Sequence, residues 1–129
     1  MVRVARFVDM LAIATLLIAL PANAADKEKT VKVAVRVDSE HPAYEGFRAL
    51  DGDPQSMWHT EFGNRDLPGP HQITLDLGQS YEIAGFTYLP RPGGGNGTIG
   101  RFECYLSDNP KDMGPPVLDW RSIPLAREV

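Results

Sequence analysis

Residues 70–91, PHQITLDLGQSYEIAGFTYLPR, decide the fold class of this chain. Apolar and polar residues alternate from Gln72 to Leu77, which is the period of a strand with one face buried. After Gly78, residues 81–89 form a second run that is rich in aromatic and β-branched residues, and these residue types favour strands. The stretch therefore predicts two consecutive strands separated by a turn.

Two further strands are expected on either side of this pair. Valine stands at every second position of residues 31–37, and apolar residues alternate with polar ones in residues 102–107. Residues 38–46 carry Gly, Pro and Ser, and residues 91–100 are rich in glycine, so both segments are typical of loops. No segment after residue 24 sustains the apolar period of a helix. Short strands joined by Gly- and Pro-containing turns predict an all-β fold, an antiparallel sandwich or barrel.

The first 24 residues have the pattern of a secretory signal peptide. Arg3 and Arg6 precede an apolar run at residues 11–20, and Pro21 and the small-x-small sequence at residues 22–24 follow it. The alternative is an uncleaved N-terminal anchor. We predict a signal peptide over 1–24, a flexible segment over 25–30 and one domain over 31–129, in a protein that is secreted, periplasmic or held at the cell surface.

The charge of the chain argues against some classes of partner, and its cysteine content argues against an internal disulfide. The chain has 13 basic and 17 acidic side chains and a net charge of −4, and removal of residues 1–24 makes the remainder more acidic. No basic cluster remains, so we expect no nucleic-acid partner and no insertion into a membrane. Cys104 is the only cysteine, so the domain cannot form an internal disulfide.

Three short motifs resemble cofactor- or metal-binding sites, but the residues around them do not fit such sites. The glycines at 95, 97 and 100 match a dinucleotide fingerprint, but a strand pattern follows them where a helix is required. Asp51 and Asp53 begin like an EF-hand loop, which then lacks its glycine and its final carboxylate. The three histidines have no spacing suited to zinc. We therefore predict a protein that is not an enzyme.

A family resemblance covers nearly all of residues 31–120. Five segments occur in the order in which the discoidin-like family carries them, and the chain resembles the coagulation factor 5/8 type C domains and the carbohydrate-binding modules of family 32. The segments are ALDGDPQSMWHT (49–60), PHQITLDLG (70–78), YEIAGFTYLPR (81–91), NGTI (96–99) and RFECYLSDNP (101–110). The resemblance implies an eight-stranded antiparallel jelly roll whose loops hold a ligand at one end.

The family pattern also continues through further strands beyond the position of Val129. We therefore expect the C-terminal strands of the sandwich to be missing and its open edge to favour self-association.

The turn at residues 51–56 is implied to hold a structural calcium ion. Asp51, Asp53 and Ser56 offer the hard oxygen ligands that Ca²⁺ prefers, and the resemblance adds backbone carbonyls such as that of Arg48. The alternative is an ion-free turn in which Asp51 caps the backbone. Trp58 is expected in the core beneath this turn.

The resemblance also implies a sugar site. It places His59, Phe62, Arg91 and Asn96 together, with Glu40 as a further acidic ligand. Arg, Asn and His can bind sugar hydroxyls, and an aromatic ring can pack against the apolar face of a sugar. We thus predict a carbohydrate-binding module for galactose-type glycans. The alternatives are a protein- or lipid-adhesion domain and a truncated remnant without a ligand.

Overall fold

The structure is a computed structural model that describes residues 2–8, 13–18, 31–63, 67–90, 99 and 101–119, the first two ranges as backbone only. The described elements are β1 (Val2–Val8), β2 (Ile13–Ile18), β3 (Ala34–Val37), the 3₁₀ helix η1 (Gly46–Leu50), β4 (Gln72–Tyr81), β5 (Ile83–Leu89), β6 (Glu103–Ser107) and β7 (Leu118–Asp119). The all-β prediction is confirmed. The described part of the chain contains no helix with the length and apolarity needed to span a bilayer.

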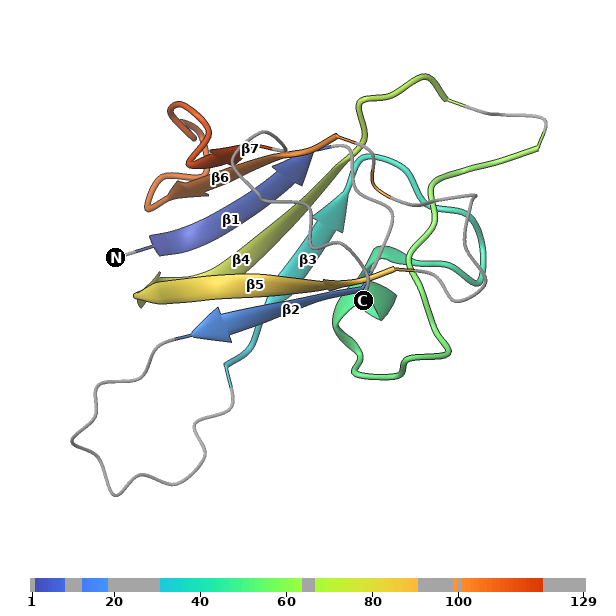
Figure 1. Cartoon of the computed structure of the whole chain (residues 1–129), viewed down its shortest axis with the longest axis horizontal. Coiled ribbons are helices and arrows are strands. Elements are labelled where there is room, and N and C mark those ends of the chain that lie inside the picture. Colours follow the sequence, from blue (N-terminus) through green and yellow to red (C-terminus); the bar gives the residue numbers. More distant parts are fainter. Residues whose placement is uncertain are drawn as a thin grey trace, which may run out of the picture.

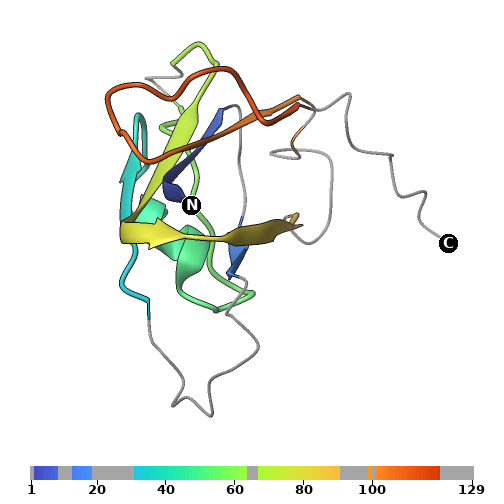
Figure 2. The same cartoon turned by 90° about the vertical axis from the view of Figure 1, so that its left-hand side faces the viewer.

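The strands form two antiparallel sheets (Figure 1). The larger sheet has the order β3-β4-β1-β6-β7, and the smaller sheet pairs β2 with β5. The larger sheet is not closed, because β3 and β7 each pair on one side only among the described strands. The chain passes from one sheet to the other at Glu82, the single residue between β4 and β5. Figure 2 shows β5 leaving the line of β4 at this corner.

The core lies on one face of β4. Ile73, Leu75 and Leu77 are buried, while the residues between them are half-buried, as the alternation in the sequence predicts. Ala49 of η1, Trp58 and Cys104 of β6 complete the buried set. Half-buried apolar side chains of the strands, of η1 and of the adjoining loops pack against it, namely Val33, Val35, Val37, Leu50, Phe86, Tyr88, Ile99, Phe102, Leu106 and Leu118.

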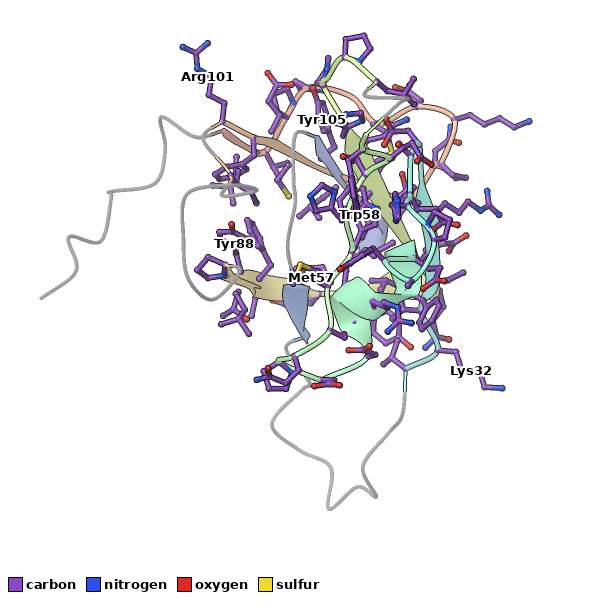
Figure 3. The ribbon with its side chains drawn as sticks, turned by 90° about the vertical axis from the view of Figure 1, so that its right-hand side faces the viewer. Lys32, Met57, Trp58, Tyr88, Arg101 and Tyr105 are labelled. Atoms are coloured by element: carbon purple, nitrogen blue, oxygen red, sulfur yellow. The ribbon has the colours of Figure 1, made fainter. Side chains whose placement is uncertain are left out.

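Trp58 occupies the middle of the molecule (Figure 3) and is 1% exposed. Its indole Nε1–H donates to the backbone carbonyl of Ser39 at 2.9 Å, so the one polar atom of the ring has a partner. The hydroxyl of Ser39 in turn accepts the backbone N–H of Glu61 at 2.9 Å. The loops before η1 and after Trp58 are thereby joined. The prediction that Trp58 belongs to the core is confirmed.

The N-terminal segment takes part in both sheets. Val2–Val8 forms β1 between β4 and β6, and Ile13–Ile18 forms β2 beside β5. These strands lie within the predicted signal peptide, and cleavage after Ala24 stays a prediction. The predicted flexible segment 25–30 and the last residues of the predicted domain, 120–129, lie outside the described residues.

We expect Trp58→Ala to destabilise the domain by about 3–5 kcal/mol, the usual cost of removing a buried aromatic side chain. Trp58→Phe should cost less, because it keeps most of the ring but leaves the buried Ser39 carbonyl without its donor. Urea unfolding followed by far-ultraviolet circular dichroism measures both. Equal stability of wild type and Trp58→Ala would show that this ring does not organise the core.

Candidate functional site

Four aromatic rings gather on the loops that flank η1 and Trp58. His59 and Phe62, both predicted for the site, lie with their ring centroids 4.9 Å apart in an edge-to-face contact. His41 stacks on Phe62 with centroids 3.8 Å apart and ring planes 13° apart. Tyr44 contacts His41, His59 and Phe62 edge-on, with centroids 5.8–6.1 Å apart. These four residues are called the ring cluster below.

A tight turn and a short backbone ladder hold the ring cluster. Pro42 and Ala43 are the central residues of a turn closed by the Tyr44 N–H, which donates to the His41 carbonyl at 2.9 Å. Pro42 suits the first central position, and the positive φ of 70° at Ala43 fits the second position of a type II turn. His41 N–H donates to the His59 carbonyl at 2.9 Å, and His59 N–H donates to the Tyr44 carbonyl at 3.1 Å. The backbone therefore sets the positions of three of the four rings.

The protonation pattern of both histidine rings follows from their neighbours. His59 Nδ1 lies 2.7 Å from the Thr60 carbonyl, and His41 Nδ1 lies 2.8 Å from the Pro42 carbonyl. A carbonyl oxygen can only accept, so each Nδ1 carries the proton that is donated. In the neutral imidazole, Nε2 of each ring is then a hydrogen-bond acceptor. The ring cluster thus combines aromatic surface with two nitrogen acceptors.

Phe62 is the exposed member of the ring cluster, with 41% of its surface accessible. His41 covers one of its faces. At most one face of the Phe62 ring is therefore left for a ligand, and the edge-on contacts of Tyr44 and His59 limit the orientation that a ligand can take there.

Glu40 lies next to the ring cluster in sequence, but its carboxylate has a structural partner. Its Oε2 accepts the N–H of Gly46 at 2.8 Å and holds the first residue of η1. Glu40 also lines an open groove between β3 and η1, which residues 35–40 and 45–47 form. The sequence indicated Glu40 only as a sugar ligand and did not indicate its hydrogen bond to Gly46.

Arg91 and Asn96 lie outside the described residues, so the structure does not place these two predicted ligands. The structure does place the residues Pro90 and Ile99, which flank the segment that contains Arg91 and Asn96. Pro90 directly follows β5, and the N–H of Ile99 donates to the hydroxyl of Tyr88 at 3.2 Å.

The predicted calcium turn brings three oxygen atoms together. The hydroxyl of Ser56 donates to Asp51 Oδ2 at 2.6 Å and also lies 3.3 Å from the Arg48 carbonyl. Oxygens that share a Ca²⁺ ion at its usual bond length lie about 3 Å apart, so this spacing suits the ion. The carboxylate of Asp53 points elsewhere, because its Oδ1 accepts the N–H of Gln55 at 2.9 Å.

The same turn is complete without an ion. Asp51 Oδ1 accepts the N–H of Asp53 at 2.9 Å, so Asp51 also caps the backbone, as the alternative interpretation expected. The hydrogen bond from Ser56, followed by that from the Asp53 backbone, lowers the pKa of Asp51. The described residues hold no group of three or more His, Cys, Asp or Glu side chains that could bind a metal. The oxygens that converge in the turn are one carboxylate oxygen of Asp51, the hydroxyl of Ser56 and the carbonyl of Arg48.

Sequence reasoning did not include His41 and Tyr44 in the site. In the sequence His41 is a candidate only for zinc, and the spacing of the histidines argues against zinc. The signal that could have found both residues is the His-Pro-Ala-Tyr order, since a turn centred on Pro42 and Ala43 places its two flanking side chains close together.

Comparison with known proteins shows that this chain is similar to a small part of several larger proteins. A sialidase of Micromonospora viridifaciens is 42% identical over 89 residues, which cover 66% of this chain and 14% of that protein. A galactose oxidase of Gibberella zeae is 41% identical over 86 residues, covering 65% and 13% of the two proteins. An A type blood N-acetyl-α-D-galactosamine deacetylase of Flavonifractor plautii is 37% identical over 73 residues, covering 55% and 9%. No solved structure matches the chain.

A family model described as the F5/8 type C domain matches residues 33–114, a range that begins just before β3 and ends after β6. The matched range contains Trp58 with the core around it, the ring cluster, and the turn at residues 51–56, called the oxygen-rich turn below. Because this range is well over half of the chain, the protein belongs to the F5/8 type C, or discoidin, domain family.

Proposed function

We propose that this domain is an exported, non-catalytic module that binds galactose-type glycans through the ring cluster. The observation that supports this most directly is the exposed ring of Phe62 beside the acceptor nitrogen of His59. The names of the relatives agree with a carbohydrate ligand, because a sialidase, a galactose oxidase and an N-acetylgalactosamine deacetylase all act on sugars. The aligned region is a small part of each of those enzymes.

The chemistry of the site matches the two surfaces of a sugar ring. The apolar C–H face of the sugar packs on the free face of Phe62, and a sugar hydroxyl donates to His59 Nε2. Arg91 contributes a planar set of donors and Asn96 contributes one donor group and one acceptor. Glu40 takes part through the carboxylate oxygen that does not hold Gly46.

Arg91→Ala should weaken binding about ten- to hundredfold, because it removes charge-assisted hydrogen bonds worth about 1.5–3 kcal/mol. Isothermal titration with galactose, lactose and N-acetylgalactosamine measures the change. Lys111→Ala, at an exposed position in the loop after β6, is the control for loss of a basic side chain and should bind like wild type. If Arg91→Ala binds as well as wild type, the site is misplaced. If folded wild type binds no glycan, the proposed function is wrong.

Phe62→Ala should weaken the same binding through loss of the apolar contact and leave the fold intact, since the ring is 41% exposed. Val117, at 51% exposed just before β7, offers an exposed apolar side chain on another part of the chain. We expect Val117→Ala to keep the wild-type affinity. Equal affinities for both variants would mean that Phe62 does not contact the sugar.

We further propose that the turn binds a structural Ca²⁺ ion through Asp51, Ser56 and the Arg48 carbonyl, with Asp53 positioning Asp51. Added Ca²⁺ should raise the melting temperature, because a ligand that binds only the native state stabilises it by about 2.7 kcal/mol at a hundredfold excess over Kd. Asp51→Ala should abolish the response and Asp112→Ala should keep it. Identical melting curves in calcium and in chelator would contradict the proposal.

Export requires its own test. We propose that a signal peptidase removes residues 1–24, so the N-terminal sequence of protein recovered outside the cytoplasm should begin at Ala25. A retained N-terminus on protein that has reached that compartment would instead support the uncleaved anchor.

A further inference from the structure

His71, the residue directly before β4, has a hydrogen-bond partner on each side of its ring. Its Nδ1 lies 3.0 Å from Oδ2 of Asp38, and its Nε2 lies 3.2 Å from the backbone carbonyl of Leu67. The side chain of His71 is 12% exposed, so most of the ring is shielded from water. The ring therefore joins two parts of the chain, the end of β3 and the residues just before β4.

Both partners of His71 can only accept a hydrogen bond. A backbone carbonyl has no proton to donate, and an aspartate carboxylate, which is ionised at neutral pH, has none either. A neutral imidazole carries one N–H and one lone pair, so it can donate to only one of the two partners and turns its lone pair toward the other. The imidazolium form donates at both nitrogens and satisfies both contacts.

The carboxylate of Asp38 is itself held in place. Its Oδ1 accepts the backbone N–H of Gln72 at 2.8 Å, and its own backbone N–H donates to the Gln72 carbonyl at 3.3 Å. Asp38 therefore cannot turn away from His71 without losing a contact to β4.

Among the described residues, Asp38 is the charged side chain that contacts His71. Arg36 and Glu40 stand two positions to either side of Asp38 along the chain and carry opposite charges, and the Glu40 carboxylate holds the first residue of η1. Residues 67–70 and the first four residues of β4 carry no charged side chain. The charge that faces a protonated His71 is therefore that of Asp38.

We propose that His71 holds both ring protons in the folded domain and acts as a pH-dependent clamp between the end of β3 and residues 67–70. Loss of one proton at higher pH breaks one of the two hydrogen bonds of the clamp. Because Asp38 directly precedes Ser39, the clamp lies beside the loop that is bonded to Trp58. The inference goes beyond the proposed glycan and calcium sites and does not rest on either.

The direction of the pH effect follows from proton binding. The folded domain retains a proton at His71 that the unfolded chain releases as the pH rises through the range in which histidine titrates, about pH 5–8. The stability that the clamp contributes is therefore present at the acid end of this range and is lost toward its alkaline end.

The first test measures the protonation of the ring itself. In the full chain with isotope-labelled histidine, NMR follows the ring nitrogens of the three histidines from about pH 5 to 9, the range that brackets histidine titration. His71→Asn identifies the signals of His71. His41 and His59 are internal references, because each has a carbonyl partner at Nδ1. We expect His71 to keep both protons to a higher pH than either reference. Release of a proton from His71 at the same pH as the references, or at a lower one, would overturn the proposal.

The second test measures the urea midpoint of unfolding over the same pH range. The midpoint of the wild type should fall as the pH rises, and Asp38→Asn should remove most of this fall. An amide at position 38 donates to Nδ1 of a neutral His71, whose Nε2–H then donates to Leu67, and the amide oxygen still accepts from Gln72. Equal pH dependence of wild type and Asp38→Asn would contradict the clamp.

Asp112→Asn is the matched control for this variant. Asp112 also accepts a backbone N–H two residues further along the chain, from Gly114 at 3.1 Å, but its contacts include no histidine. We expect Asp112→Asn to keep the pH dependence of the wild type. Loss of that dependence in Asp112→Asn as well would assign it to aspartates in general and not to the clamp.

The third test reports whether residues 67–70 loosen. Leu67 is 52% exposed and contacts His71 through its backbone, so a spin label on Leu67→Cys leaves the contact in place. Cys104 does not compete for the label, because it is buried and burial raises the pKa of its thiol to about 12. We expect slow label motion at the acid end of the range and faster motion at the alkaline end. With His71→Asn added, motion should be fast throughout.

Label motion that does not change with pH while His71 is present would overturn the clamp. None of the three tests adds a glycan or calcium, so failure of this inference is distinguishable from failure of the proposed function.

Discussion

The hydrogen bond from the Trp58 indole to the Ser39 carbonyl is the contact on which the rest of the structure depends. A buried indole N–H without a partner would cost about 1–3 kcal/mol, so the ring can fill the core only where a carbonyl meets it. Ser39 supplies that carbonyl from the loop after β3, and its hydroxyl holds Glu61 on the other side. One pair of residues therefore fixes both loops that carry the ring cluster.

The same hydrogen bonds hold the ring cluster in place. His59 directly follows Trp58 in the chain, and its backbone forms a ladder with His41 and Tyr44. The rings consequently stand on a backbone that is tied to the core rather than on a free loop. A site held in this way loses little conformational freedom when a ligand binds, which favours affinity without a large interface.

The oxygen-rich turn is connected to the core through η1, which directly precedes it in the chain. Arg48 and Ala49 are neighbours in η1, so the carbonyl that faces Ser56 precedes a residue with no exposed surface. Changes in the turn are thus transmitted to the residue that packs beside Trp58. An ion bound at Asp51, as we propose, would therefore act on the core through η1.

The sequence by itself determined four of the seven described strands, β3 to β6, together with the buried face of β4, the place of Trp58 in the core and the family. Alternation in residues 72–77 identifies the buried face of β4 because successive side chains of a strand point to opposite sides, and Trp58 and the turn at Asp51 are recognisable from their neighbours in the chain. Only the tertiary structure decided what depends on pairing across distance. It stacked His41 on Phe62, turned the carboxylate of Asp53 to Gln55, bound Glu40 to Gly46 and set β1 between β4 and β6. Local periodicity reports which face of a strand is buried, whereas the choice of partner strand and of side-chain contact depends on long-range packing that no short segment encodes.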